Sequence, residues 1–198
     1  MHLPTPSPRR LIGATAIACA AALAPAAALA ATSSPAAQAA TASASCATSG
    51  LVVWLTVPPG NDYAGGAYYD LEFTNLSGRA CTLRGYPGVS AVSLTGRQLG
   101  SPAGWGSAKT TAVRLASGAT ATAQLQITDT GNYSQCFQRL PQGPGKPGIL
   151  PTAAGLRVYP PNQTAATEIS YPLQACAHTG PVWIHAGPVT AGGPPPGL

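Results

Sequence analysis

The stretch "AYYDLEFTN", residues 67–75, decides the fold, because its apolar and polar side chains alternate. The apolar residues take every second position: Ala67, Tyr69, Leu71 and Phe73. Between them lie the polar residues Asp70, Glu72 and Thr74. A period of two places one face of a β-strand in a core and leaves the other in water, as in antiparallel sheets. The stretch therefore predicts one strand of an antiparallel sheet.

The same alternation recurs in "ATATAQLQIT", residues 119–128. Its polar side chains are expected to form a flat hydrogen-bonding surface: Thr120, Thr122, Gln124 and Gln126. Shorter strands are expected at 51–57, 81–84, 89–94, 111–115, 156–159, 167–171 and 182–186. The best helical candidate, residues 133–140, is short. About eight short strands between Gly- and Pro-rich turns predict an all-β fold, an immunoglobulin-like antiparallel β-sandwich, with a closed barrel as the alternative.

Four cysteines lie in the predicted domain: Cys46, Cys81, Cys136 and Cys176. An even number of cysteines in an exported chain predicts two disulfides. If strands 51–57 and 67–75 form a hairpin, the residue before the first strand falls near the residue after the second. This geometry predicts the pair Cys46–Cys81. The remaining two cysteines then form the pair Cys136–Cys176. Each disulfide would stabilise the fold by about 2–4 kcal/mol.

The N-terminus is typical of a secretory signal peptide over residues 1–30. Arg9 and Arg10 precede an apolar run, and cleavage sites of the A-x-A type follow at 28–30 and 37–39. We expect a low-complexity leader over 31–45, a folded domain over 46–186 and a disordered Gly/Pro tail over 187–198. The predicted location is extracellular, with cell-wall association as an option and no membrane attachment after signal cleavage. We expect a monomer.

The stretch "NLSGRACTLRGYPGVS", residues 75–90, contains two turn signals and a cysteine. Its simplest interpretation is structural: Gly78 adopts a positive φ in the first turn, and Pro87 shapes the second. The alternative is that Tyr86 contacts a ligand from a rigid loop. The sequence favours the structural interpretation.

The string "FTNLSGRACTLRGYPGVSAV", residues 73–92, resembles a known family together with "AVRLASGATATAQL", residues 112–125, and the first cysteine of the domain. This is the actinobacterial secreted domain-of-unknown-function family numbered 4232. The resemblance covers residues 46–186. It implies export and a sandwich-like all-β domain, and it supplies neither an activity nor catalytic residues.

The composition argues against several classes of function. The predicted domain has only two histidines, His178 and His185, and the whole chain has five carboxylates. We therefore expect no metal site and no cofactor. Asp70 and Glu72 could form a hydrolase pair, but two solvated strand charges are the simpler interpretation. No catalytic elbow surrounds a serine or cysteine, so we expect no enzyme.

The net charge of the chain is +5. Two of the ten basic residues lie in the predicted signal peptide, so the mature chain carries eight basic and five acidic residues. The bases do not cluster along the sequence, so nucleic acid is not an expected partner. A weakly basic exported protein is drawn to an anionic cell wall.

Trp105 lies in the Gly-flanked stretch "PAGWGSAK", residues 102–109, which has no strand alternation. An exposed Trp on a loop is a candidate contact for a sugar or a protein partner. The alternative is that Trp105 covers a sheet edge. Trp54 and Trp183 lie in predicted strands and are expected in the core. Trp105 and Tyr86 are thus the candidate binding residues.

These features together predict an exported, non-catalytic binding or interaction module for cell-wall polymer or a secreted protein. The alternative is a secreted protease inhibitor. Its inhibitory loop would be residues 138–150, which follow Cys136 closely. A disulfide-anchored rigid loop is what such an inhibitor needs, because it loses little entropy on binding.

Overall fold

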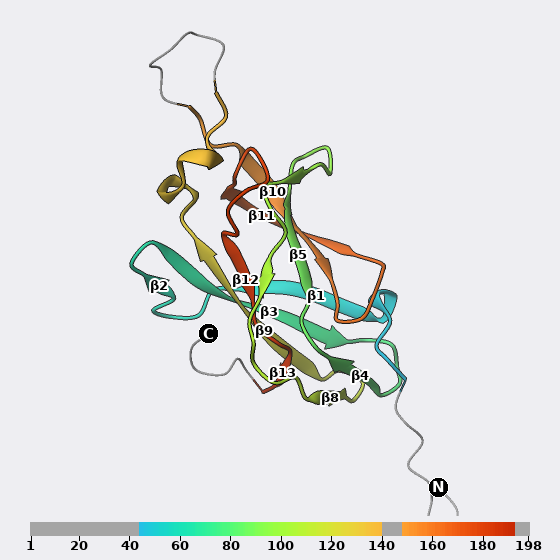
Figure 1. The fold of residues 1–198 in the computed structure, drawn as a ribbon. Coiled ribbons are helices and arrows are strands. Elements are labelled where there is room, and N and C mark those ends of the chain that lie inside the picture. Colours follow the sequence, from blue (N-terminus) through green and yellow to red (C-terminus); the bar gives the residue numbers. More distant parts are fainter. Residues whose placement is uncertain (1–43, 140–147, 193–198) are drawn as a thin grey trace, which may run out of the picture. The chain divides into compact units, whose positions relative to one another are not determined.

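The computed structural model describes residues 44–139 and 148–192 (Figure 1). The predicted signal peptide and nearly all of the predicted leader lie outside these residues and stay predictions. Ala44 and Ser45, the end of the predicted leader, are described. Ser45 forms a parallel β-bridge with Thr82. The described helices are short 3₁₀ turns, and none of them is long and apolar enough to cross a membrane.

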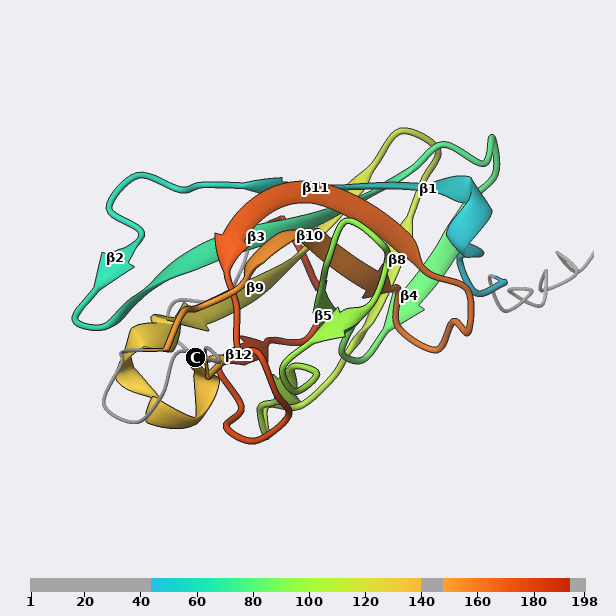
Figure 2. The same cartoon turned by 90° about the horizontal axis from the view of Figure 1, so that it is seen from above.

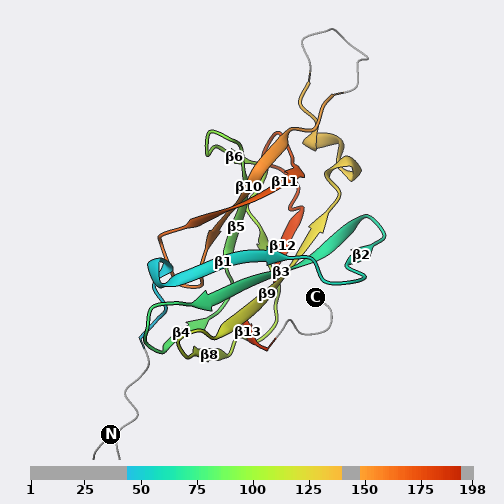
Figure 3. The same ribbon diagram turned by 180° about the vertical axis from the view of Figure 1, so that it is seen from behind.

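The described residues form an all-β sandwich, which confirms the predicted fold class. The larger sheet has the order β1-β3-β9-β12-β7, with β2 on β3 and β13 on β9. Its strands are β1 (Leu51–Thr56), β2 (Asp62–Tyr63), β3 (Gly66–Asn75), β7 (Gly104–Trp105), β9 (Thr120–Thr128), β12 (Ile184–Ala186) and β13 (Thr190–Ala191). Seen from behind, β1, β3 and β9 lie side by side (Figure 3).

The second sheet has the order β11-β10-β5-β6. Its strands are β5 (Gly88–Val92), β6 (Gln98–Leu99), β10 (Thr152–Tyr159) and β11 (Thr167–Gln174). A separate pair joins β4 (Cys81–Arg84) to β8 (Ala112–Leu115). The 3₁₀ turns are η1 (Thr48–Gly50), η2 (Thr130–Asn132) and η3 (Ser134–Cys136). Figure 2 shows β4, β8 and η1 at one end, and β2, η2 and η3 at the other.

The core forms between the two main sheets, as the alternation in β3 and β9 predicts. Leu71 and Phe73 of β3 lie opposite Ala123 and Ala121 of β9, so a large side chain faces a small one at each step. All four are completely buried. The second sheet contributes the buried side chains Val89, Ala91, Leu156 and Val158. Alternating large and small side chains lets such a core fill its volume closely.

The stretch 75–90 builds the fold through Asn75, which is completely buried at the end of β3. Its Nδ2 donates to the carbonyl oxygens of Arg79 at 2.7 Å, Leu115 at 3.1 Å and Ala116 at 3.2 Å. Its Oδ1 accepts hydrogen bonds from the backbone N (3.0 Å) and the Oγ (2.7 Å) of Ser77. Gly78 has φ +76° and closes the turn. One buried amide thus joins the end of β3, the following turn and the end of β8.

Both disulfides have the expected pairing. Cys46–Cys81 ties the first described residues to β4, and the bond from the Cys46 backbone N to the Thr82 carbonyl (3.0 Å) reinforces this link. Cys136–Cys176 joins η3 to the segment after β11, and both of its cysteines are completely buried. The two disulfides therefore hold the start of the domain and the turn after β9.

Two tryptophans were expected in the core, and only Trp183 is there. It is completely buried and directly precedes β12. The expectation for Trp54 is wrong. Its side chain is half-buried on the outer face of the larger sheet, and Nε1 donates to Glu72 Oε2 at 2.8 Å. The reason is the strand period: Leu51, Val53 and Leu55 pack against the core, which directs Trp54 to the other face.

Two boundaries also differ from the prediction. Residues 133–140 were the best helical candidate, but their described part holds only the 3₁₀ turn η3. Residues 187–192 were assigned to a disordered tail and are ordered instead. Val189 is buried and its backbone N donates to the Gly85 carbonyl at 2.9 Å. The ordered domain therefore extends past residue 186.

Replacing Asn75 with Ala should lower the free energy of unfolding by about 3 kcal/mol, because several buried groups lose their hydrogen-bond partner. Urea unfolding of the oxidised protein measures this change. Asn132→Ala is the matched control, since Asn132 is exposed and its one side-chain hydrogen bond is 3.4 Å long. Equal stabilities of the two variants would contradict the role given to Asn75.

Candidate functional site

The structure brings the two candidate binding residues together. Tyr86 lies in the turn between β4 and β5, and Trp105 ends the short strand β7. Their rings are stacked, with centroids 5.9 Å apart and an interplanar angle of 18°. We call this pair the aromatic site. Two rings from separate segments of the chain are thus in contact.

Trp105 is exposed and at the same time fixed in position. Of its surface, 63% is exposed to solvent. Its Nε1 donates to the Pro87 carbonyl at 3.0 Å, and β7 pairs in parallel with β12. β7 is the last strand of the larger sheet, so Trp105 also lies at a sheet edge. An indole whose polar atom is already bonded presents mainly its apolar surface to a partner.

Tyr86 stacks on Trp105, and hydrogen bonds hold both its hydroxyl and the backbone next to it. Its hydroxyl donates to the Ala108 carbonyl at 2.6 Å, which ties the segment after β7 to the turn after β4. The backbone beneath it is anchored as well. The Gly85 carbonyl accepts from the Val189 N at 2.9 Å, and the Arg84 carbonyl accepts from Asn162 Nδ2 at 2.9 Å. A site fixed in this way loses little entropy on binding.

The glycines around Trp105 have different roles. A Cβ at Gly104 would lie 2.9 Å from Val182 Cγ1 and 3.2 Å from His185 Nδ1. Gly104 is therefore required by close packing against the segment that leads into β12. A Cβ at Gly106 would meet no atom within 4 Å. Gly106 is therefore not required by packing.

The polar surface expected along β9 is largely occupied. Thr122 is only 7% exposed, and its carbonyl accepts from Thr190 Oγ1 at 3.2 Å, where β13 pairs with β9. The hydroxyls of Thr120 and Thr74 bond to each other at 2.6 Å. Gln124 and Gln126 are half-buried. The chain itself already uses many of the groups that were expected to bind a partner.

The carboxylates Asp70 and Glu72 lie side by side on the outer face of β3, in different surroundings. Glu72 accepts hydrogen bonds from Trp54 Nε1 and, at 3.0 Å, from Thr56 Oγ1. The Oδ1 of Asp70 and the Oε1 of Gln124, its partner across the strand pair, are both buried without a donor. Burial raises the pKa of Asp70 above its usual value, and the nearby charge of Glu72 adds to the effect.

Of the other groups of possible chemical interest, His185 lies beside the aromatic site, opposite Gly104 in the β7–β12 pair. Among residues 44–139 and 148–192, no three His, Cys, Asp or Glu side chains form a metal-binding group. A cavity of about 220 Å³ between the sheets is lined by Tyr69, Asp129 and Thr130 among others. Burial and a hydrogen bond to Tyr171 raise the pKa of Tyr69, which therefore stays a neutral phenol.

The candidate inhibitory loop is described only at its base. Gln138 and Ile149 form an antiparallel bridge with hydrogen bonds of 2.7 and 3.1 Å, close to the Cys136–Cys176 disulfide. Residues 140–147 lie outside the described residues. The base of the loop is thus closed by two backbone hydrogen bonds and a nearby disulfide.

Comparison with known families places the chain. A family described as "Domain of unknown function (DUF4232)" matches residues 46–190. The chain belongs to this family. The match includes the first residue of β13, in line with the order observed past residue 186. No curated protein and no solved structure matches the chain. The family inferred from residues 73–92 is thereby confirmed, and its description assigns no activity.

Sequence reasoning named Tyr86 and Trp105 separately and missed that they stack. It also missed the backbone acceptors that hold them, at Pro87 and Ala108. Backbone carbonyls carry no sequence signal. The two segments are held close by a long-range backbone bond, from Ala103 N to the Val89 carbonyl at 2.8 Å, and β7 itself has only two residues.

Asp70→Asn should raise the free energy of unfolding at pH 7. A carboxyl whose pKa is higher in the folded than in the unfolded chain costs stability when it ionises. This cost is absent below the unfolded pKa and grows as pH rises toward the folded pKa. The variant's advantage should therefore shrink toward zero below about pH 4. Unfolding curves across this pH range measure it.

Asp129→Asn is the control for this change, because it removes an exposed carboxylate and so reports any general effect of net charge. A gain in the Asp70→Asn variant that is the same at every pH would contradict the assignment. So would a loss of stability at neutral pH.

Proposed function

We propose that the chain is an exported, non-catalytic binding module and that the aromatic site holds a glycan of the cell wall. The observation that carries this proposal is Trp105. It is 63% exposed, yet a ring stack, a hydrogen bond and a strand pairing fix it in place. A large exposed aromatic ring held in one position is the kind of side chain that contacts partners at low entropic cost.

The chemistry of an indole suits a sugar ring. The apolar C–H face of a pyranose can lie on the flat face of Trp105 and bury part of the 150–250 Å² or so that a large aromatic side chain offers. The hydrogen bond to Pro87 already fixes the orientation of the ring. Binding then costs little side-chain entropy, which is the usual advantage of rigid aromatic contacts.

Three features support an extracellular role. The two disulfides of the domain are compatible with an oxidising, extracellular location. The N-terminal sequence is typical of a signal peptide. The mature chain, with eight basic and five acidic residues, is weakly basic, which favours attraction to anionic wall material. A secreted protein partner on the same aromatic site is the second form of this proposal.

The test is co-sedimentation of the oxidised mature protein with purified bacterial cell walls. Trp105→Ala should weaken binding about tenfold or more, as expected for the central aromatic contact of an interface. Trp54→Ala is the matched control, since β1 and β7 form opposite ends of the strand order of the larger sheet. Equal binding by wild type and Trp105→Ala would remove the aromatic site from the proposal.

A second candidate function is protease inhibition by residues 138–150. The closed base of this segment supports it, because an inhibitory loop must resist opening after it docks. Titration of subtilisin with the oxidised protein should then reach full inhibition at one equivalent. Steady cleavage between residues 138 and 150 without inhibition would exclude this candidate.

A further inference from the structure

We propose that the glycan held by the aromatic site is anionic, and that Arg84, Lys109 and Arg114 bind its phosphate or carboxylate groups. We call these three residues the cationic patch. This inference rests on the proposed function and adds the chemical class of the ligand. It is carried by the charge distribution, by the register of β4 and β8, and by the contact between Tyr86 and Ala108.

The charges of the chain are unevenly distributed. No Asp or Glu occurs between Glu72 and Asp129, while five basic residues do: Arg79, Arg84, Arg97, Lys109 and Arg114. This segment runs from the end of β3 through β4, β5, β6, β7, β8 and β9, and it contains both residues of the aromatic site. The acidic residues lie on β2, β3 and β11 and directly after β9. The surroundings of the aromatic site are thus supplied by a segment that carries only positive charge.

Two of the cations share one face of the β4–β8 pair. In the register, Thr82 lies opposite Arg114 and Arg84 lies opposite Ala112. Leu83, Val113 and Leu115 are buried, so Arg84 and Arg114 both occupy the exposed face. They are diagonal neighbours, a relation that places the two residues about 7–8 Å apart at the backbone. Two long arginine side chains that start at this spacing can reach one anionic group together or two neighbouring ones.

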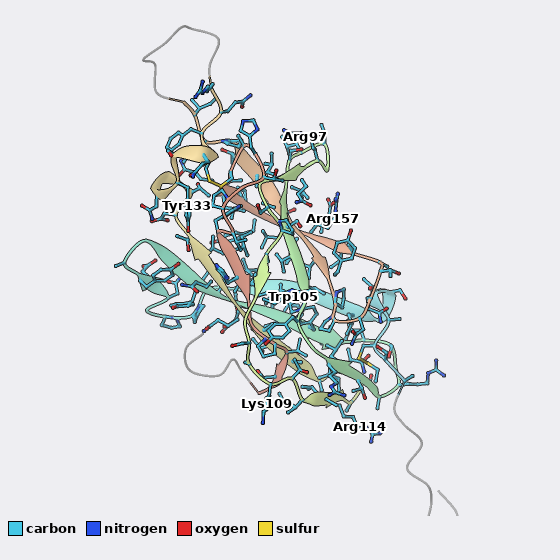
Figure 4. The ribbon with its side chains drawn as sticks, in the orientation of Figure 1. Arg97, Trp105, Lys109, Arg114, Tyr133 and Arg157 are labelled. Atoms are coloured by element: carbon cyan, nitrogen blue, oxygen red, sulfur yellow. A yellow bond between two sulfur atoms is a disulfide. The ribbon has the colours of Figure 1, made fainter. Side chains whose placement is uncertain are left out.

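The end of β4 and the segment before β8 both lie close in sequence to residues of the aromatic site or to their hydrogen-bond partners. Arg84 precedes Tyr86 by two residues, and Lys109 directly follows Ala108, whose carbonyl accepts the Tyr86 hydroxyl. Figure 4 shows Trp105 near the middle of the domain, with Lys109 and Arg114 below it and Arg97 toward the opposite end. The short hydrogen bond at Ala108 therefore fixes where the Lys109 backbone starts relative to the stacked rings.

Among the described residues, the cationic patch has no ion-pair partner. All three side chains are exposed, and the ion pair found among the described residues joins Arg157 to Glu168 elsewhere, at 2.8 Å. Neighbouring like charges without a counter-charge repel each other, and a bound anion removes this repulsion. Arginine binds phosphate and carboxylate groups through two parallel hydrogen bonds, which suits both ligand classes.

A glycan fits this surface better than a nucleic acid. Specific nucleic-acid binding commonly uses 6–10 or so phosphate contacts, whereas the patch offers three cations next to one exposed ring. A sugar polymer with a charge on some of its units matches one stacking surface flanked by a few cations. An exported domain also meets such polymers at the cell surface.

The experiment compares three preparations of the same Gram-positive cell walls by co-sedimentation. The first is untreated, the second is treated with hydrofluoric acid to remove phosphodiester-linked polymers, and the third is amidated with carbodiimide to neutralise carboxylates. Loss of binding to the second assigns phosphate as the ligand group, and loss of binding to the third assigns carboxylate. Either result supports the proposal.

The variants isolate the cationic patch. Arg84→Gln with Lys109→Gln should weaken binding to untreated walls about tenfold or more, as the loss of hydrogen bonds to charged groups predicts. Arg97→Gln with Arg139→Gln removes the same charge from other exposed positions and should change binding less than about twofold. The difference between the two pairs separates the patch from a general effect of net charge.

Each contrary result has its own meaning. If all three wall preparations and both double variants bind as the wild type does, the ligand is not anionic, while loss of binding in Trp105→Ala still supports the proposed function. If Trp105→Ala has no effect, or no wall binds, the proposed function fails and this inference fails with it. Tighter binding of a single-stranded oligothymidylate than of walls would overturn the glycan assignment in favour of nucleic acid.

Discussion

The pairing of β3 with β9 is the constraint from which the rest of the structure follows. It runs from Gly66↔Thr128 to Thr74↔Thr120, and it places Leu71 and Phe73 against alanines. A slip of one strand by one residue would turn all of that strand's apolar side chains to the solvent face. The strand pairing continues from β9 to the edge of the sheet, because β9 pairs with β12 and β12 pairs with β7. The position of Trp105 at the edge thus depends on the central pair.

The stretch 75–90 has two roles in the fold. Its first residue, Asn75, is buried, and its side-chain hydrogen bonds join the end of β3 to the β4–β8 pair. Tyr86, eleven residues later, stacks under Trp105. The segment that closes the core is therefore also the segment that supports the aromatic site. This arrangement gives the site rigidity without a separate scaffold, because the turn that presents Tyr86 is anchored to the fold on both sides.

The sequence predicted what depends on long, regular patterns. Both strands of the central pair, the all-β class and the two disulfides follow from period-two alternation and cysteine spacing. The two-residue strands β2, β6, β7 and β13 were missed, because two residues cannot show a period. Trp54 was misplaced because lying in a predicted strand was taken to mean burial, whereas its position in the alternation of β1 places it on the outer face. The contact between Tyr86 and Trp105 depends on β7, and so it could not be predicted either.

The proposed function requires Trp105 to be fixed in the free protein and to contact the ligand. A ¹⁵N–¹H spectrum should resolve the indole groups of Trp54, Trp105 and Trp183, because each lies in a different environment. We expect a single, slowly exchanging Trp105 indole signal in the free protein that shifts on titration with soluble wall fragments, while the Trp54 and Trp183 signals stay unchanged. A Trp105 signal broadened by motion, or one that does not shift while the Trp54 signal moves, would contradict it.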